Sequence, residues 1–364
     1  MIDVIRQVDE QVANIMQAEE ERQRKTICLI PSENYCSPAV SYALASSLTN
    51  KYAEGYPHVW RDGDKQNENG RYYQGQRNTN AIEALAIERA LQLFTPDPAA
   101  YHANVQPLSG SPANLAVLSA FLKPGEPFLG MSLDDGGHLT HGHKVSVTGK
   151  YYRAIQYGVD QNGMIDYDQV EELAQTYQPK VIFSGATAYP RKIDFARLGQ
   201  IAKSVHAILV ADISHICGLC IAGEHPHPFP HADVITTTTH KILRGPRGGV
   251  ILCKKEYGSM IDKAVFPGLQ GGPHMNTIAA MAIAFKEAME DAYRQYAKQV
   301  VKNATILAEE LKKAGFRLVS GGTENHLILV DVVNSREDVK AKDGAWLAAR
   351  LERAGIIVID TPHG

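Results

Sequence analysis

The stretch Val234-Ile235-Thr236-Thr237-Thr238-Thr239-His240-Lys241 is an apolar, β-branched run that ends in a histidine and a lysine. These residue types predict a buried strand. The glycines and proline of residues 245–249 predict a loop after it, because they do not continue a helix. A lysine at a buried strand end is desolvated, which makes its amine nucleophilic and suited to form a Schiff base. A lone lysine there is more often a solvated strand terminus, so the rest of the chain must decide.

Composition describes an ordinary globular chain. Of the 364 residues, 44% are hydrophobic and 21% charged, and the length allows two domains. The net charge of −3 gives no reason to expect nucleic acid or a membrane as partner. Residues 1–25 are rich in Gln and Glu, unlike a secretory signal. Five cysteines make no disulfide framework, so we expect a cytoplasmic protein, with Cys217 and Cys220 as buried, inert thiols.

Apolar strands alternate with helices over about 200 residues in the middle of the chain. We expect strands at 103–107, 127–133, 181–186, 207–213, 233–239 and 249–253, and helices near 112–122, 167–177 and 194–204. This alternation predicts an α/β domain with a mainly parallel sheet sandwiched by helices.

The whole chain divides into three predicted parts. Residues 1–50 form an N-terminal arm with one helix over 1–25, and residues 51–275 form the large α/β domain. Residues 276–364 form a long helical region and the start of a small, incomplete α/β domain. Within the large domain, the polar residues 58–70 predict an exposed loop. Asn80 and Glu83 occupy the positions of a capping box for a helix from 81 to 94.

Two further strand ends carry groups suited to a charged ligand. Ser109-Gly110-Ser111 follows a predicted strand and begins a helix, so its N–H groups and hydroxyls suit a phosphate dianion. Taken alone, this tripeptide is only a good helix cap. Asp212 ends another apolar strand, where a buried carboxylate needs a cation or hydrogen-bond donors. A protonated pyridine nitrogen meets that need, and so does a structural arginine.

His138 follows a fourth apolar strand and stands among glycines, where its flat ring can lie against another planar ring. The nearby His141 suggests a zinc site as an alternative, but no cysteine and no H-x-x-x-H spacing supports it. We therefore expect no metal. Ligands of open α/β sheets bind at the carboxyl ends of strands. A phosphate cradle, a stacking ring, a buried carboxylate and Lys241 together fit pyridoxal phosphate bound covalently to that lysine.

Several long motifs carry a family resemblance. They lie at residues 31–35, 48–56, 109–114, 136–142, 236–241, 245–249, 265–273 and 320–326. These motifs resemble those of serine hydroxymethyltransferase, a fold-type-I enzyme that depends on pyridoxal phosphate. The resemblance implies transfer of the serine hydroxymethyl group to tetrahydrofolate, giving glycine and 5,10-methylenetetrahydrofolate. It also implies a homodimer or tetramer whose active sites are shared between subunits.

The resemblance further implies a role for each matching residue around the cofactor. Lys241 would hold the cofactor, Asp212 would bind its ring nitrogen, and His138 would stack on its ring. Thr187 and His215 would approach the phenolic oxygen. The phosphate would be held by Ser109, Gly110, Ser111 and His240, with Gly271 and Gly272 reaching it from the partner subunit.

At the substrate, the resemblance assigns proton exchange at the hydroxyl group to Glu54, flanked by Tyr52 and Tyr73. A carboxylic acid placed in a cleft suits that task. Other contacts to the amino acid or to folate would come from Ser32, Tyr72, Leu133, Gly137 and Leu139.

The chain departs from the family pattern in two places. The family binds the substrate carboxylate with an arginine in a Gly-Ile-Arg-x-Gly-Thr segment, which this chain does not contain. We therefore expect the chain as given to bind pyridoxal phosphate but to turn over serine poorly, because the bidentate anchor is missing. Two alternatives stay open: aldol cleavage of β-hydroxy amino acids without folate, and a cofactor-binding scaffold with impaired catalysis. Residues 58–70 are also longer than the usual link, which we expect to extend the mouth of the site or the dimer contact.

Overall fold

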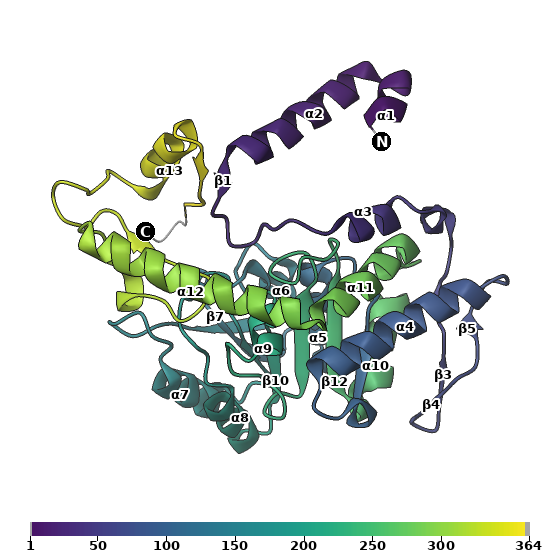
Figure 1. The fold of residues 1–364 in the computed structure, drawn as a ribbon. Helices are drawn as coiled ribbons and strands as arrows, with labels where there is room; N and C mark the ends of the chain where they lie inside the picture. Colours follow the sequence, from purple (N-terminus) through teal and green to yellow (C-terminus); the bar gives the residue numbers. More distant parts are fainter. Residues whose placement is uncertain (1, 361–364) are drawn as a thin grey trace.

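A seven-stranded mixed sheet forms the centre of the computed structural model, which describes residues 2–360 (Figure 1). Across the sheet the order is β6 (Tyr101–Asn104), β12 (Gly249–Lys254), β11 (Val234–Thr238), β10 (Ile208–Asp212), β9 (Val181–Ser184), β7 (Pro127–Met131) and β8 (Arg153–Tyr157). Strand β12 is antiparallel to both of its neighbours, and all other neighbouring pairs are parallel. The predicted, mainly parallel α/β sheet is confirmed, although β8 was not predicted.

Helices cover both faces of this sheet, and the strands alternate their apolar side chains between the two layers. In β10, Leu209 and Ala211 pack into one apolar cluster, whereas Val210 between them packs into the other. Because all strands of the sheet except β12 run in the same direction, their carboxyl ends lie at one edge of the sheet. The helices around the sheet are α4 (Arg77–Phe94), α5 (Gly110–Phe121), α6 (Val147–Tyr151), α7 (Tyr167–Tyr177), α8 (Phe195–Ser204), α9 (Cys217–Ala222), α10 (Gly258–Lys263), α11 (Met275–Ala288) and α12 (Asp291–Lys313).

Three predictions for these helices have different outcomes. The long helical region 276–314 is confirmed as α11 and α12, and Cys217 and Cys220 are buried free thiols in α9. The capping box at Asn80 and Glu83 is wrong, because α4 already begins at Arg77. The Glu83 carboxylate is instead fully buried and paired with the Arg71 guanidinium at 2.5 Å. The role of Glu83 is therefore to form a buried ion pair with Arg71, not to cap a helix.

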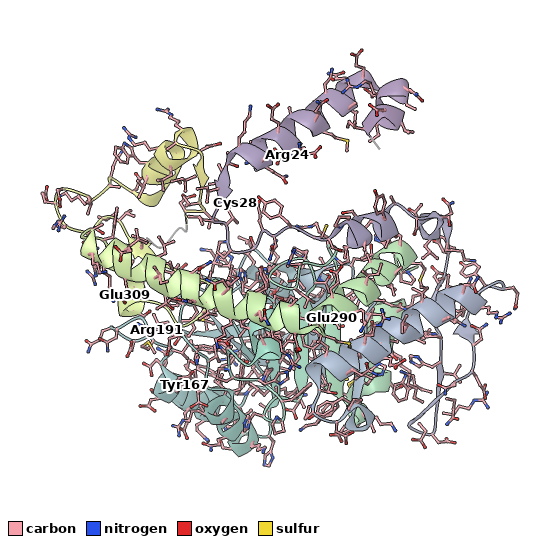
Figure 2. All side chains as sticks on the ribbon, viewed as in Figure 1. Arg24, Cys28, Tyr167, Arg191, Glu290 and Glu309 are labelled. Atoms are coloured by element: carbon pink, nitrogen blue, oxygen red, sulfur yellow. The ribbon has the colours of Figure 1, made fainter. Side chains whose placement is uncertain are left out.

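The N-terminal arm contains two helices, not the single predicted one. Helices α1 (Ile2–Val8) and α2 (Glu10–Lys25) meet at Asp9, whose side chain accepts a hydrogen bond from the Val12 amide at 3.0 Å and caps α2. The arm projects away from the sheet domain (Figure 1). Figure 2 shows Arg24 and Cys28 at its base, and the side chains of α2 point into open space.

The arm ends in a strand that joins it to the last part of the chain. Strand β1 (Ile27–Cys28) pairs in parallel with β15 (Ile356–Ile357), and α13 (Gly344–Arg353) precedes β15. The predicted strand at 326–333 is much shorter: β14 (Val330–Asp331) pairs with β13 (Arg317–Leu318). The small unit near the C-terminus thus includes a strand from the N-terminal arm.

Residues 59–66 form a hairpin, so the prediction of a loop is wrong there, whereas most of residues 58–70 are exposed as expected. Strand β3 (Val59–Arg61) pairs with β4 (Asp64–Gln66), and β2 (Gly55–Tyr56) pairs with β5 (Gly70–Arg71) outside it. The two-residue turn between β3 and β4 is Asp62-Gly63, with φ angles of 51° and 83°. Asp-Gly is a strong sequence signal for this turn type, which needs positive φ at both positions. That signal identifies the hairpin in an otherwise polar stretch.

The remaining short elements complete the chain. They are α3 (Pro38–Leu44), η1 (Ser47–Asn50), η2 (Pro98–Ala100), η3 (Leu139–His141), η4 (Lys255–Tyr257), η5 (Ala264–Leu269) and η6 (Val319–Gly321). Within residues 2–360, no helix combines the length and the apolar character needed to cross a bilayer.

Candidate active site

A pocket lies at the carboxyl end of the central strands, where Lys241 and Asp212 meet. Its walls are formed by Gly110, His138, Ala186, Thr187, Asp212, Ser214, His215, Thr238 and Lys241. Five of the residues predicted to bind the cofactor around Lys241 therefore come together with it in one cavity. They come from the turns after β7, β9, β10 and β11 and from the first turn of α5.

Lys241 lies in the turn after β11, between Thr238 at the strand end and the glycine-containing loop 245–249. Burial lowers the pKa of its amine, while the negative charge of Asp212 acts in the opposite direction. A lysine whose amine is partly desolvated is a better nucleophile at neutral pH than one in water.

The Asp212 carboxylate is 9% exposed and well supplied with donors. Oδ2 accepts a hydrogen bond from Asn114 Nδ2 at 2.8 Å, and Oδ1 accepts one from the Ser214 amide at 3.0 Å. His141 Nε2 lies 3.3 Å from Oδ2. Burial alone would raise the pKa of Asp212, but the hydrogen bond from His141 and nearby positive charge hold it below its usual value. The carboxylate is therefore ionised at neutral pH.

His138 presents its ring to the same pocket and is fixed by Thr140. Its Nδ1 lies 2.7 Å from Thr140 Oγ1 and accepts a hydrogen bond from the Thr140 amide at 3.2 Å. Burial lowers the pKa of His138 to about 4, so its imidazole is neutral at physiological pH. A neutral, fixed ring suits stacking against a flat ligand.

Three residues without a predicted role hold these groups in place: Asn114, Thr140 and His141. The Asn114 amide donates to Thr140 Oγ1 at 2.8 Å as well as to Asp212, and its oxygen accepts from Thr236 at 2.6 Å. A single buried asparagine inside the otherwise small and apolar helix α5 was the sequence signal for this network. His141 lies in the motif at residues 136–142, but its contact with Asp212 depends on the turn η3.

The wall of the pocket formed by Gly110, at the start of α5, is suited to a phosphate group. Helix α5 begins at Gly110, and the Ser109 side chain makes no capping hydrogen bond, so the first turn of the helix keeps its anion-binding character. A Cβ atom at Gly110 would lie 2.8 Å from Thr238 Cγ2, so only glycine leaves this approach open. Ser111 is exposed.

Three buried polar atoms around the pocket lack a partner within the described part of the chain: Thr238 Oγ1, His215 Nδ1 and His240 Nδ1. Buried polar atoms in native proteins are normally hydrogen-bonded, so these atoms are positioned for a polar ligand. These groups match the parts of pyridoxal phosphate. The Lys241 amine suits its aldehyde, and the Asp212 carboxylate and the neutral His138 ring suit its aromatic ring. The unpartnered polar atoms and the N-terminus of α5 suit its polar substituents and phosphate.

A second group of predicted site residues lies around Glu54. Tyr73 donates a hydrogen bond to Glu54 Oε2 at 3.0 Å, and the rings of Tyr52 and Tyr73 meet edge to face at 5.3 Å. A Cβ at Gly271 would lie 3.2 Å from Glu54 Oε1, and one at Gly272 would lie 3.7 Å from the Tyr52 ring. None of these five residues lines the Lys241 pocket within the described chain.

The predicted substrate and folate residues lie on three other segments. Ser32 is half-buried in the turn after β1, and Tyr72 is 68% exposed and packs on Phe266 with ring centroids 5.4 Å apart. Leu133, Gly137 and Leu139 follow β7, and the Leu139 side chain is 44% exposed. None of these residues lines the Lys241 pocket itself.

Fold and pocket together define a fold-type-I pyridoxal-phosphate enzyme. The sequence profile described as serine hydroxymethyltransferase matches residues 5–358. The chain is 55% identical over 349 residues to the serine hydroxymethyltransferase of Acidothermus cellulolyticus, an alignment that covers 96% of this chain and 77% of the relative. It is 51% identical over 354 residues to the enzymes of that name from Desulfotalea psychrophila and Sorangium cellulosum, covering 97% of this chain and 79% of each. The chain belongs to the serine hydroxymethyltransferase family, whose enzymes depend on pyridoxal phosphate and use tetrahydrofolate as co-substrate.

Proposed function

We propose that the Lys241 pocket binds pyridoxal phosphate and carries out the family reaction, transfer of the serine hydroxymethyl group to tetrahydrofolate. The observation that carries this proposal is that a half-buried lysine and an ionised aspartate line the same pocket. Pyridoxal phosphate, when bound, supplies an aldehyde that condenses with amines and a ring that takes up electron density.

The residues of the pocket would each hold one part of this cofactor. Lys241 would bind it covalently, and the Asp212 carboxylate would keep the ring nitrogen protonated. His138 would stack on the ring, with Thr187 and His215 near its phenolic oxygen. The phosphate would be bound by Ser109, Gly110, Ser111 and His240, at the N-terminus of α5.

Glu54 would exchange the proton of the serine hydroxyl group, with Tyr52 and Tyr73 beside it. Because this group does not line the Lys241 pocket of its own chain, we propose that a second copy supplies it, in a homodimer or tetramer. Gly271 and Gly272 lie beside Glu54 and Tyr52 and would reach the cofactor phosphate of the partner together with them.

The serine carboxylate would lie near Ser32, and folate would lie along Tyr72, Leu133, Gly137 and Leu139 at the exposed mouth. All five cysteines are unpaired, which supports a reducing cytoplasm as the place of action.

Replacing Asp212 by asparagine tests the proposed function. Asparagine keeps the shape of the side chain and one acceptor but removes the negative charge that would hold the ring nitrogen protonated. We expect kcat for serine with tetrahydrofolate to fall by about a hundredfold or more, since this charge acts in a buried site. The visible absorbance of the bound cofactor should persist, because Lys241 is unchanged.

The matched control is Asp168→Asn, because the Asp168 side chain is 97% exposed. This variant should keep the full rate. An Asp212→Asn enzyme that turns over serine at the unsubstituted rate would contradict the proposed role of the carboxylate.

A further inference from the structure

A second buried polar cluster surrounds Asp262 beneath the hairpin β3–β4, and none of its members lines the Lys241 pocket. His58 Nε2 and Trp60 Nε1, both on the segment 58–70, lie 2.8 Å from Asp262 Oδ2. His102 Nε2 and Asn104 Nδ2, both on β6, lie 2.8 Å from Oδ1. Four donors from two separate segments thus converge on one carboxylate of α10, and they use both lone pairs of each oxygen.

The protonation of this cluster follows from its geometry. Burial alone would raise the pKa of Asp262, but His102 and His58 hold it below its usual value, so the carboxylate is ionised. An ionised carboxylate only accepts hydrogen bonds, so both facing Nε2 atoms carry a proton. Among the described residues, neither His58 Nδ1 nor His102 Nδ1 has a hydrogen-bond partner, so each ring carries its proton on the Nε2 atom that faces Asp262.

The same geometry argues against a metal ion, although two histidines and an aspartate lie close enough to bind one. A metal on both Nε2 atoms would move the imidazole protons to Nδ1, where the described chain offers no acceptor. The site is also tightly packed by its neighbours. A Cβ at Gly258 would lie 2.7 Å from Trp60 Cη2 and 2.9 Å from His102 Cγ. The cluster is therefore a hydrogen-bonded joint between the hairpin, β6 and α10.

One side of this joint leads directly to Glu54. The Tyr56 hydroxyl donates a hydrogen bond to the Asp262 carbonyl oxygen at 2.7 Å and accepts one from Asn104 Nδ2 at 2.9 Å. Tyr56 is the second residue after Glu54 and lies in β2, the strand that pairs with β5. The position of the Glu54 backbone is thus fixed to Asp262 through one buried side chain.

The other side of the joint reaches Glu54 through η5, which follows α10. Phe266 in η5 packs against Tyr56, with ring centroids 6.5 Å apart, and against Tyr72 at 5.4 Å. The same segment leads to Gly271, where a Cβ would lie 3.2 Å from the Glu54 carboxylate. Both segments that flank Glu54, the strand β2 and the turn after η5, are therefore connected to Asp262.

We propose that the Asp262 cluster is a positioning device for Glu54, built in part by the β3–β4 hairpin segment, which sets the Glu54 carboxylate for proton exchange without touching substrate or cofactor. The proposal rests on the role proposed above for Glu54. His58 and Trp60 give the hairpin a defined task in the reaction, distinct from extending the mouth of the site.

Asp262→Asn tests this device in the holoenzyme. The asparagine amide turns one acceptor atom into a donor that faces two other donors, so one side of the joint must open. We expect kcat for serine to fall about tenfold, because small displacements of a catalytic group are costly. The KM for serine and the cofactor absorbance should stay within about twofold, because the Lys241 pocket is untouched. Trp60→Phe removes a single donor and keeps an aromatic ring, and it should lower kcat about threefold.

The matched control on the same hairpin is Arg61→Ala, which breaks only the exposed ion pair between Arg61 and Glu68 and should leave kcat unchanged. The proposal is overturned if both Asp262→Asn and Trp60→Phe keep the full kcat while Glu54→Gln is inactive. It is equally overturned if these two variants lose bound cofactor in proportion to their loss of kcat. A further contrary result would be one zinc ion per chain in the purified enzyme that Asp262→Asn releases. A Glu54→Gln enzyme with the full rate would instead refute the proposed role of Glu54 itself.

Discussion

The Lys241→Ala variant is expected to lose covalent attachment of pyridoxal phosphate and at least about a thousandfold in serine turnover, because no other amine lines the pocket to replace it. Two measurements check this. After borohydride reduction of the unsubstituted holoenzyme, the mass of the cofactor should be found on the peptide that contains Lys241. In the variant, no peptide should carry that mass, and the absorbance of covalently bound cofactor should be missing.

Lys203→Ala is the matched control for this prediction. Lys203 is an exposed lysine at the end of α8, so its removal should leave both cofactor attachment and turnover unchanged. Cofactor mass found on a different lysine of the unsubstituted enzyme would contradict the assignment of Lys241.

The Glu54→Gln variant is expected to lose about a hundredfold or more in serine turnover, the contribution typical of a positioned proton donor and acceptor. Glutamine keeps the size of the side chain and an oxygen that can accept the hydrogen bond from Tyr73, but it cannot take up a proton. Cofactor attachment should be normal, because the bond to Lys241 and the contacts proposed for the cofactor ring and phosphate do not involve the Glu54 side chain. Steady-state kinetics with serine and tetrahydrofolate, alongside the cofactor spectrum, separate the two effects.

Glu172→Gln on the exposed face of α7 provides the control and should behave like the unsubstituted enzyme. If Glu54→Gln lost its cofactor together with its activity, the residue would be structural rather than a proton carrier.

The sheet was predictable from sequence because its strands are apolar runs separated by helical patterns and turns. Residues 234–238 and 208–212 are nearly continuous buried segments, and such segments identify the central strands of a parallel sheet. Pairing between distant segments was not predictable in this way. The parallel contact of Ile27–Cys28 with Ile356–Ile357 joins two-residue strands across the chain, and nothing local in either strand specifies its partner.

The cofactor end of the site was predictable in outline because each group follows a strand that the sequence identifies. Lys241, Asp212 and His138 meet once those strands lie side by side. The support around them was not predictable, because it depends on side chains that meet only in three dimensions. Asn114 connects Asp212 to Thr140, and Asp262 gathers donors from residues 58 to 104, so neither contact has a local sequence pattern.

Mixing the two inactive variants shows whether the Lys241 pocket of one copy is completed by the Glu54 group of a second copy. Lys241→Ala and Glu54→Gln subunits are dissociated, combined in equal amounts and allowed to reassemble. A mixed dimer then contains one site with both residues intact, so about a quarter of the unsubstituted turnover should return, since half of the randomly formed dimers are mixed. If the mixture stays as inactive as its two components although mixed dimers have formed, each site is built from a single chain. That result would contradict the proposal that two copies share the site.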